Sequence, residues 1–208
     1  MRQIITASII SYLIGSIPTA YIFGRVLKGI DIRKFGSGNV GATNALRVLG
    51  RWPAIAVLAL DILKGFLPVL FLGNFFVQRI NYLPQETVRL VVGLSCIAGH
   101  SWSLFLRFKG GKGIATTLGV LLALAIKVPG LNIVLALLVL SWFLIFAFTR
   151  IVSLASIVSA VLLPVYMLVF RQTFTLIFSS FILCAFAIIR HRSNLRRLWQ
   201  GKEHRIKF

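Results

Sequence analysis

The sequence predicts an all-α fold: a polytopic integral membrane helical bundle of about seven transmembrane helices, forming a single domain over residues 1–208. Of its 208 residues, 58% are hydrophobic and only 13% are charged, which is too apolar for a water-soluble core of this size. The apolar residues also gather in runs of about the length that a helix needs to cross a bilayer. Lipid is therefore expected to surround most side chains.

Seven apolar segments set the helix count. They are residues 4–23, 52–71, 88–105, 114–126, 131–148, 154–170 and 174–189. The fourth is the shortest, and as a helix it would cover only about 20 Å. No internal repeat is visible, and Val128-Pro129-Gly130 predicts a tight outer turn between the fourth and fifth helices.

Basic residues set the expected orientation. With seven crossings, one side of the bilayer holds 17 of the 23 Lys and Arg residues: Arg25, Lys28, Arg33, Lys34, Arg47, Arg51, Arg107, Lys109, Lys112, Arg150, Arg190, Arg192, Arg196, Arg197, Lys202, Arg205 and Lys207. Because cytoplasmic loops are enriched in Lys and Arg, this side is expected to be cytoplasmic, with the N-terminus outside and the C-terminus inside. Arg2 and the apolar run after it look like the start of a signal peptide, but no cleavage site is evident, so a retained first span is expected.

The formal net charge of +19 narrows the class of partner. A nucleic-acid-binding protein keeps its basic residues on a wet globular face, whereas here they lie between apolar runs, so nucleic acid is not an expected partner. Anionic lipid headgroups or a phosphorylated substrate explain the same excess. Cys96 and Cys184 lie inside apolar runs and are expected to be small buried hydrophobes, and no acidic cluster suggests a metal.

The first predicted cytoplasmic loop carries a glycine motif. Three glycines formally match GxGxxG: Gly36, Gly38 and Gly41. A dinucleotide site needs this motif inside a βαβ unit, which the chain does not offer, but glycines before a helix also turn backbone N–H groups toward an anion. Polar neighbours can add donors: Ser37, Asn39, Thr43 and Asn44. Arg47 lies one helical turn beyond Thr43, where its guanidinium can bind phosphate oxygens; the alternative is a flexible polar turn.

A second glycine-rich segment follows the third apolar run. It includes His100, Lys109, Gly110, Gly111, Lys112 and Gly113. Gly113 follows Lys112 where a Walker A motif needs Ser or Thr, so ATP hydrolysis is not indicated. The lysines and glycines still suit a phosphate, although the same residues also occur at ordinary helix entrances.

A third polar group lies at the C-terminal end. His191 and Asn194 are three residues apart on one predicted helical face, and Glu203 follows in the tail. The alternative is a basic helix that only contacts anionic lipid. Ser153 lies beside Arg150 at the last predicted cytoplasmic bend before it.

One ion pair is expected inside the bilayer. Asp61 and Lys64 lie three residues apart in the second span, and we interpret them as a structural bridge between helices. An HxxxxD acyltransferase motif is missing, since His100 leads to Phe105 and His191 to Arg196, and no Ser-His-Asp order is present. Any reaction is therefore expected to use an already activated substrate.

Three motifs together carry a family resemblance: GSGNVGATNALR, GHSWSLFLRFKGGKGIAT and RHRSNLRRLWQGKE, with Ser153 in TRIVSLAS. The chain resembles the bacterial acyl-phosphate:glycerol-3-phosphate acyltransferases, the PlsY family, along nearly its whole length. One departure is that the family commonly has Phe-Pro after the Gly-His pair with one intervening residue, whereas here Ser103-Leu104 follow Trp102.

The resemblance implies an enzyme of the cytoplasmic (inner) membrane, with its active site facing the cytoplasm. It would transfer an acyl group from acyl-phosphate to glycerol 3-phosphate, giving lysophosphatidic acid in the first step of phospholipid synthesis, without a cofactor. The implied catalytic residues are Ser37, Arg47, Lys112, His191 and Asn194. The implied substrate-binding residues are Gly36, Gly38, Asn39, Gly41, Thr43, Asn44, His100, Lys109, Gly110, Gly111, Gly113, Ser153 and Glu203.

Two other classes remain open from the residues alone. A transporter of a phosphorylated anion would need polar residues across the bilayer, and apart from Asp61 and Lys64 the spans offer few. A structural lipid-binding subunit would explain the charge but not three spaced glycine and amide motifs. Which motif holds which phosphate, and whether His191 or a substrate phosphate takes the hydroxyl proton, also stays open.

Overall fold

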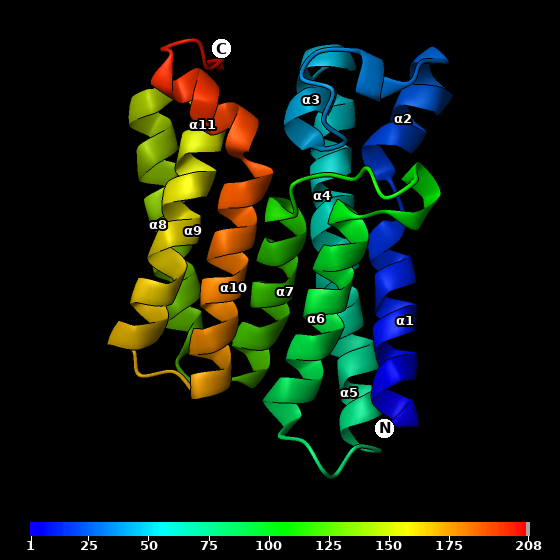
Figure 1. The fold of residues 1–208 in the computed structure, drawn as a ribbon, viewed down its shortest axis with the longest axis vertical. Helices are drawn as coiled ribbons and strands as arrows, with labels where there is room; N and C mark the ends of the chain where they lie inside the picture. The colour runs from blue at the N-terminus through cyan, green and yellow to red at the C-terminus, as the bar shows by residue number, and fades with distance from the viewer. Residues whose placement is uncertain (207–208) are drawn as a thin grey trace. The chain divides into compact units, whose positions relative to one another are not determined.

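The computed structural model describes residues 1–206, and these are helical without a strand. Lys207, which the charge count assigns to the tail, lies outside the described residues. The α-helices are α1 (Arg2–Ser16), α2 (Thr19–Lys28), α3 (Ala42–Val48), α4 (Arg51–Leu67), α5 (Gly73–Val77), α6 (Gln85–Ser101), α7 (Ile114–Lys127), α8 (Leu131–Thr149), α9 (Val152–Val169), α10 (Phe174–Arg190) and α11 (Arg192–Trp199). Short 3₁₀ turns η1 (Ile32–Lys34) and η3 (Leu104–Leu106) and a π-helical turn η2 (Pro68–Leu72) complete the set (Figure 1).

Each predicted apolar segment contains a helix, which confirms the all-α membrane fold. Among the described residues, 5 helical stretches are long and apolar enough to cross a membrane, or 6 if the bent pair of α10 and α11 forms one span. The helix in the fourth segment, α7, is shorter than these, as its sequence predicts. The count of seven crossings and the orientation of the termini stay predictions.

The first predicted span is broken. Helix α1 ends at Ser16 and α2 begins at Thr19, so segment 4–23 is not one continuous helix. Pro18 lacks an N–H group and disfavours helical geometry in the residue before it, and Ile17 has φ −57° and ψ 114°. The break leaves polar backbone groups between the helices that other residues must satisfy.

Contacts divide the chain into two compact units, unit 1 (Met1–Lys127) and unit 2, which starts at Val128. In unit 1, α1 packs along α6 and α4 packs along α7 (Figure 1). Glycines allow both close approaches, since a Cβ on Gly99 of α6 would collide with the backbone of Tyr12, and one on Gly119 of α7 with the backbone of Ile62.

Unit 2 is a series of consecutive helices joined by tight turns. Helices α8, α9 and α10 lie side by side, with α11 at one end at 62° to α10 (Figure 1). The turns place Arg150 and Arg171 at φ 58° and 48°, in the left-handed region. Hydrogen bonds also join α8 to α9, one of them from Trp142 Nε1 to Ser156 Oγ at 3.2 Å.

Candidate active site

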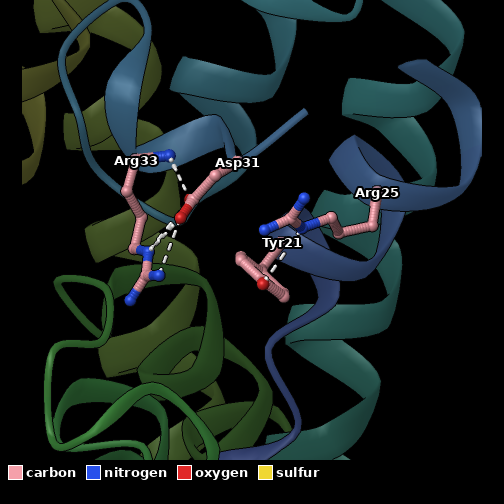
Figure 2. Close-up of polar contacts among 4 residues, drawn as sticks. All are labelled: Tyr21, Arg25, Asp31 and Arg33. Atoms are coloured by element: carbon pink, nitrogen blue, oxygen red, sulfur yellow. Dashed lines mark hydrogen bonds and ion pairs between the residues drawn. The ribbon is translucent and has the colours of Figure 1, made fainter. Parts of the chain in front are cut away.

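The first glycine loop starts from an ion pair on η1. The Asp31 carboxylate accepts from the Arg33 backbone N–H at 3.0 Å and pairs with its guanidinium at 2.7 Å (Figure 2). Hydrogen bonds from the Arg33 side chain lower the pKa of Asp31 from 3.8 to about 2. Figure 2 also shows Arg25 donating to the Tyr21 hydroxyl, at 3.1 Å. The Arg33 side chain is therefore paired with a carboxylate of its own loop.

The loop turns where its glycines allow it. Gly36 and Gly38 have φ +61° and +72°, a conformation that L side chains rarely adopt. Gly41 is extended and precedes α3, the helix predicted to carry Thr43 and Arg47 on one face. That helix is confirmed, and Arg47 lies exposed in its last turn.

Asn44 shapes this loop from within. Its side chain is 1% exposed, its Oδ1 accepts from the Ser37 N–H at 2.8 Å, and its Nδ2 donates to the carbonyls of Ile32 at 3.3 Å and Phe35 at 3.2 Å. A Cβ on Gly36 would collide with Asn44 Oδ1. These contacts give Asn44 a backbone-holding role, and a direct contact with substrate stays a prediction for it.

We expect Asn44→Ala to lower the unfolding free energy by about 2 kcal/mol, because buried backbone groups lose their partner. The check is thermal melting in detergent. Asn39→Ala is the control, since Asn39 is only half-buried, and it should leave the melting temperature unchanged. An Asn44→Ala protein that melts like the parent would contradict this role.

An apolar cluster holds the loop against the rest of unit 1. It contains Ala20, Ile32, Val40, Ala45, Leu49, Ala54, Val57 and Leu106. At the far end of α3, Lys28 Nζ donates to the Val48 carbonyl at 2.6 Å, where the helix dipole favours a cation. The position of α3, and of Arg47 on it, is thus fixed by packing from several elements.

The second glycine segment, residues 109–113, lies against the first loop. Gly110 and Gly111 donate their N–H groups to the carbonyls of Ser101 at 3.1 Å and His100 at 3.0 Å. A Cβ on Gly111 would collide with His100 Nε2 and lie 3.0 Å from the Val40 carbonyl of the first loop. Two motifs about 70 residues apart in the sequence are therefore neighbours in unit 1.

The other predicted residues of this segment surround the same backbone. Lys109 is exposed, Lys112 is half-buried, and Gly113 has φ +84° at the entrance to α7. His100 is 7% exposed, so it lies behind the glycines and not at the surface.

In unit 2 the C-terminal tail folds back, and its residue Glu203 contacts α9 and α11. The Glu203 side chain is 3% exposed, and its carboxylate accepts from Ser153 Oγ at 3.0 Å, Asn194 Nδ2 at 2.7 Å and Arg197 Nε at 2.7 Å. The Ile206 N–H donates to the Arg150 carbonyl at 2.9 Å. Two predicted site residues, Ser153 and Asn194, thus meet on the carboxylate of a third, and Arg197 joins them although it was not predicted as a site residue.

His191 lies at the bend between α10 and α11, one helical turn before Asn194. It is 3% exposed, and its Nδ1 lies 2.8 Å from the Ala187 carbonyl oxygen. Because a carbonyl only accepts hydrogen bonds, we assign the proton of the neutral ring to Nδ1, which makes Nε2 its basic nitrogen. The ring orientation is thereby set by the helix backbone.

Acidification is expected to loosen the tail. Burial alone would raise the pKa of Glu203, but hydrogen bonds from Arg197, Asn194 and Ser153 outweigh it and lower the pKa below the usual 4.5. A carboxyl whose pKa is lowered by folding stabilises the fold above its unfolded pKa, and this contribution is lost as the pH falls through the folded value. A spin label on Arg205→Cys should gain mobility reversibly below about pH 4.5. In a Glu203→Gln background the label should already be mobile at pH 7; an immobile label at both pH values would contradict this account.

The fold and these clusters define a helical membrane protein that gathers glycine backbone, amide and cationic groups of the kind that bind phosphate. Among residues 1–206 no group of three His, Cys, Asp or Glu side chains could hold a metal. A family model described as glycerol-3-phosphate acyltransferase matches residues 5–201, and the chain belongs to this family.

Individual relatives agree with the predicted resemblance and confirm it. The glycerol-3-phosphate acyltransferase 2 of Moorella thermoacetica is 44% identical over 200 residues, covering 96% of each chain. The glycerol-3-phosphate acyltransferase of Fusobacterium nucleatum is 41% identical over 201 residues, again covering 96% of each. Both span nearly their full length, so the similarity is not confined to one motif.

Two crystal structures of PlsY (YgiH), an integral membrane glycerol 3-phosphate acyltransferase, are also similar. Its glycerol 3-phosphate form has a TM-score of 0.86 at 37% identity and covers 98% of this chain and 96% of its own. Its lysophosphatidic acid form has a TM-score of 0.82 at 37% identity, with 98% and 95% covered.

Proposed function

We propose that this protein transfers an acyl group from acyl-phosphate to the first hydroxyl of glycerol 3-phosphate, forming 1-acyl-glycerol 3-phosphate and inorganic phosphate. The family membership supports the acceptor, as does the similarity to a structure in a glycerol 3-phosphate form. The observation that carries the proposal is the juxtaposition in unit 1 of two glycine segments, each with a basic side chain beside it, Arg47 and Lys112.

Each substrate in this reaction carries a phosphate. The first loop and Arg47 bind one of them through backbone N–H groups and a bidentate guanidinium. Lys112 binds the other from the second glycine segment of unit 1, and His191 and Asn194 stay predicted site residues of unit 2. Ser37, also in the first loop, contributes a hydroxyl donor. Catalysis then rests on placing the hydroxyl next to the carbonyl and on neutralising phosphate charge.

The bond changes are simple because the donor is a mixed anhydride. The hydroxyl oxygen attacks the carbonyl carbon, the bond from that carbon to the phosphate oxygen breaks, and phosphate leaves. The hydroxyl proton goes to His191 Nε2 or to a substrate phosphate oxygen. Phosphate is already a good leaving group, so a strongly basic side chain is not required.

The site faces the cytoplasm from the inner membrane in this proposal. The first loop, the second segment and the tail all lie on the side of the predicted topology that holds 17 of the 23 Lys and Arg residues. Glycerol 3-phosphate and the phosphate group of the acyl donor would then face water, while the acyl chain of the donor stays in lipid.

A comparison of acyl donors tests the proposal. Purified protein is given glycerol 3-phosphate with acyl-phosphate, acyl-CoA or acyl-carrier protein of the same chain length, and lysophosphatidic acid is measured. We expect lysophosphatidic acid in the sample that contains glycerol 3-phosphate and acyl-phosphate, and none in the samples with either thioester donor. Product from either thioester, and none from acyl-phosphate, would overturn the donor assignment while leaving the acceptor intact.

A further inference from the structure

A buried carboxylate lies in α4, below the glycine segments of unit 1. Asp61 is 1% exposed, and its Oδ1 accepts from Thr19 Oγ1 at 2.6 Å and pairs with Lys64 Nζ at 2.8 Å. This confirms the predicted bridge and extends it from α4 to α2. A charge inside an apolar span is costly unless it is paired, so the three groups are expected to act as one.

The group of Asp61, Thr19 and Lys64 also provides a hydrogen-bond partner for the backbone at the break between α1 and α2. Lys64 Nζ also donates to the Ile17 carbonyl at 2.8 Å, directly before Pro18. The residue that neutralises Asp61 therefore also holds the backbone where the first span changes direction. An ion pair used only to join two helices would not need this third partner.

The fourth member connects the group to the second glycine segment. His100 Nδ1 lies 3.7 Å from Asp61 Oδ1, and the His100 side chain is 6% exposed. On the opposite edge of the ring, Nε2 lies where a Cβ on Gly111 would have to be, and the His100 carbonyl accepts the Gly111 N–H. The imidazole is thus held between the carboxylate and the backbone of residues 110–111.

We propose that Asp61 is a positioning residue for substrate binding. Its carboxylate, together with Thr19 and Lys64, orients the ring of His100, and His100 sets the backbone of Gly110 and Gly111 beside Lys112. This inference rests on the proposed function, in which that segment binds a substrate phosphate. A displaced backbone would misplace Lys112, which would then bind its phosphate less tightly, and only the ligand held there should be affected.

The test uses the paired variant Asp61→Asn/Lys64→Met, which removes both charges together so that neither is left buried alone. Dissociation constants of glycerol 3-phosphate and of a non-transferable acyl phosphonate are measured by calorimetry, without turnover. We expect one of the two ligands to bind about tenfold more weakly and the other to bind as before. Adding His100→Gln to the paired variant should cause little further loss, because both changes act on the same segment.

Two results would overturn the positioning role. In one, both ligands bind within twofold of the parent. In the other, both weaken equally and His100→Gln adds its own full effect, as a general loss of stability would produce. Ser95→Ala is the matched control, since Ser95 lies in α6 and its hydroxyl donates to the Val91 carbonyl of the same helix at 2.8 Å, and it should leave both dissociation constants unchanged.

A second, milder variant keeps the proposal testable if the paired variant folds poorly. Thr19→Val removes one hydrogen bond to Asp61 without changing charge, and it should weaken the same ligand about threefold. If the parent does not bind the phosphonate, the dissociation constant of glycerol 3-phosphate decides. Weaker binding of glycerol 3-phosphate by the variants then supports the positioning role, and unchanged binding overturns it. The donor itself is tested separately by product formation from acyl-phosphate.

Discussion

Replacing Arg47 by alanine should lower kcat/KM by about 100- to 1,000-fold. The side chain is exposed in the last turn of α3, the helix that follows the first glycine loop. We expect Arg47 to bind a phosphate through two parallel N–H groups, and losing such a charge-assisted contact typically lowers the rate by about 100- to 1,000-fold. Steady-state kinetics with acyl-phosphate and glycerol 3-phosphate provide the measurement.

Two further variants separate geometry from charge. Arg47→Lys keeps the positive charge but loses the planar fork, so we expect an intermediate loss of about tenfold. Arg51→Ala removes an exposed cation at the start of α4, four residues away, and should stay within twofold of the parent. Equal losses for Arg47→Ala and Arg51→Ala would mean that only the general positive charge matters.

Gly111→Ala is the second change with a large expected effect. The added Cβ would collide with the His100 ring and press on the Val40 carbonyl, so the second segment must move away from the first loop. A displacement of about 1 Å at a binding site can cost about 100-fold in rate, and we expect a loss of that size. The melting temperature should also fall, as it does when a packed core is overfilled.

Gly29→Ala is the matched glycine control. Gly29 ends α2 with φ +65°, and a Cβ there would meet nothing within 4 Å. That variant should lose stability from backbone strain and still retain its activity. If Gly111→Ala kept its activity too, the close contact between the two glycine segments would have no part in catalysis.

The positions of the helices were largely predictable from the sequence, because long hydrophobic runs in a lipid environment form helices. Helix α8 begins at Leu131 and α10 begins at Phe174, as predicted, and the intramembrane pair of Asp61 and Lys64 was expected from their spacing. The break in the first span was not predicted, although Pro18 carried a signal for it.

The roles of individual site residues were less predictable. Asn44 was expected to contact substrate, which stays a prediction, but the role of its side chain in holding the backbone of its own loop was not predicted. Glu203 meets Ser153 across 50 residues of sequence, a contact that depends on how the tail folds back. Residue types and motif spacing predict the chemistry of a site, whereas the partner of each buried polar atom depends on the tertiary structure.

The stoichiometry of the reaction tests the central claim most directly. Protein in a defined bilayer is given acyl-phosphate, with and without glycerol 3-phosphate, and inorganic phosphate and lysophosphatidic acid are measured in the same sample. Acyl transfer from acyl-phosphate predicts one phosphate released for each lysophosphatidic acid formed, and neither product without glycerol 3-phosphate. Phosphate release that continues at the same rate without glycerol 3-phosphate, with no lysophosphatidic acid formed when it is present, would contradict it.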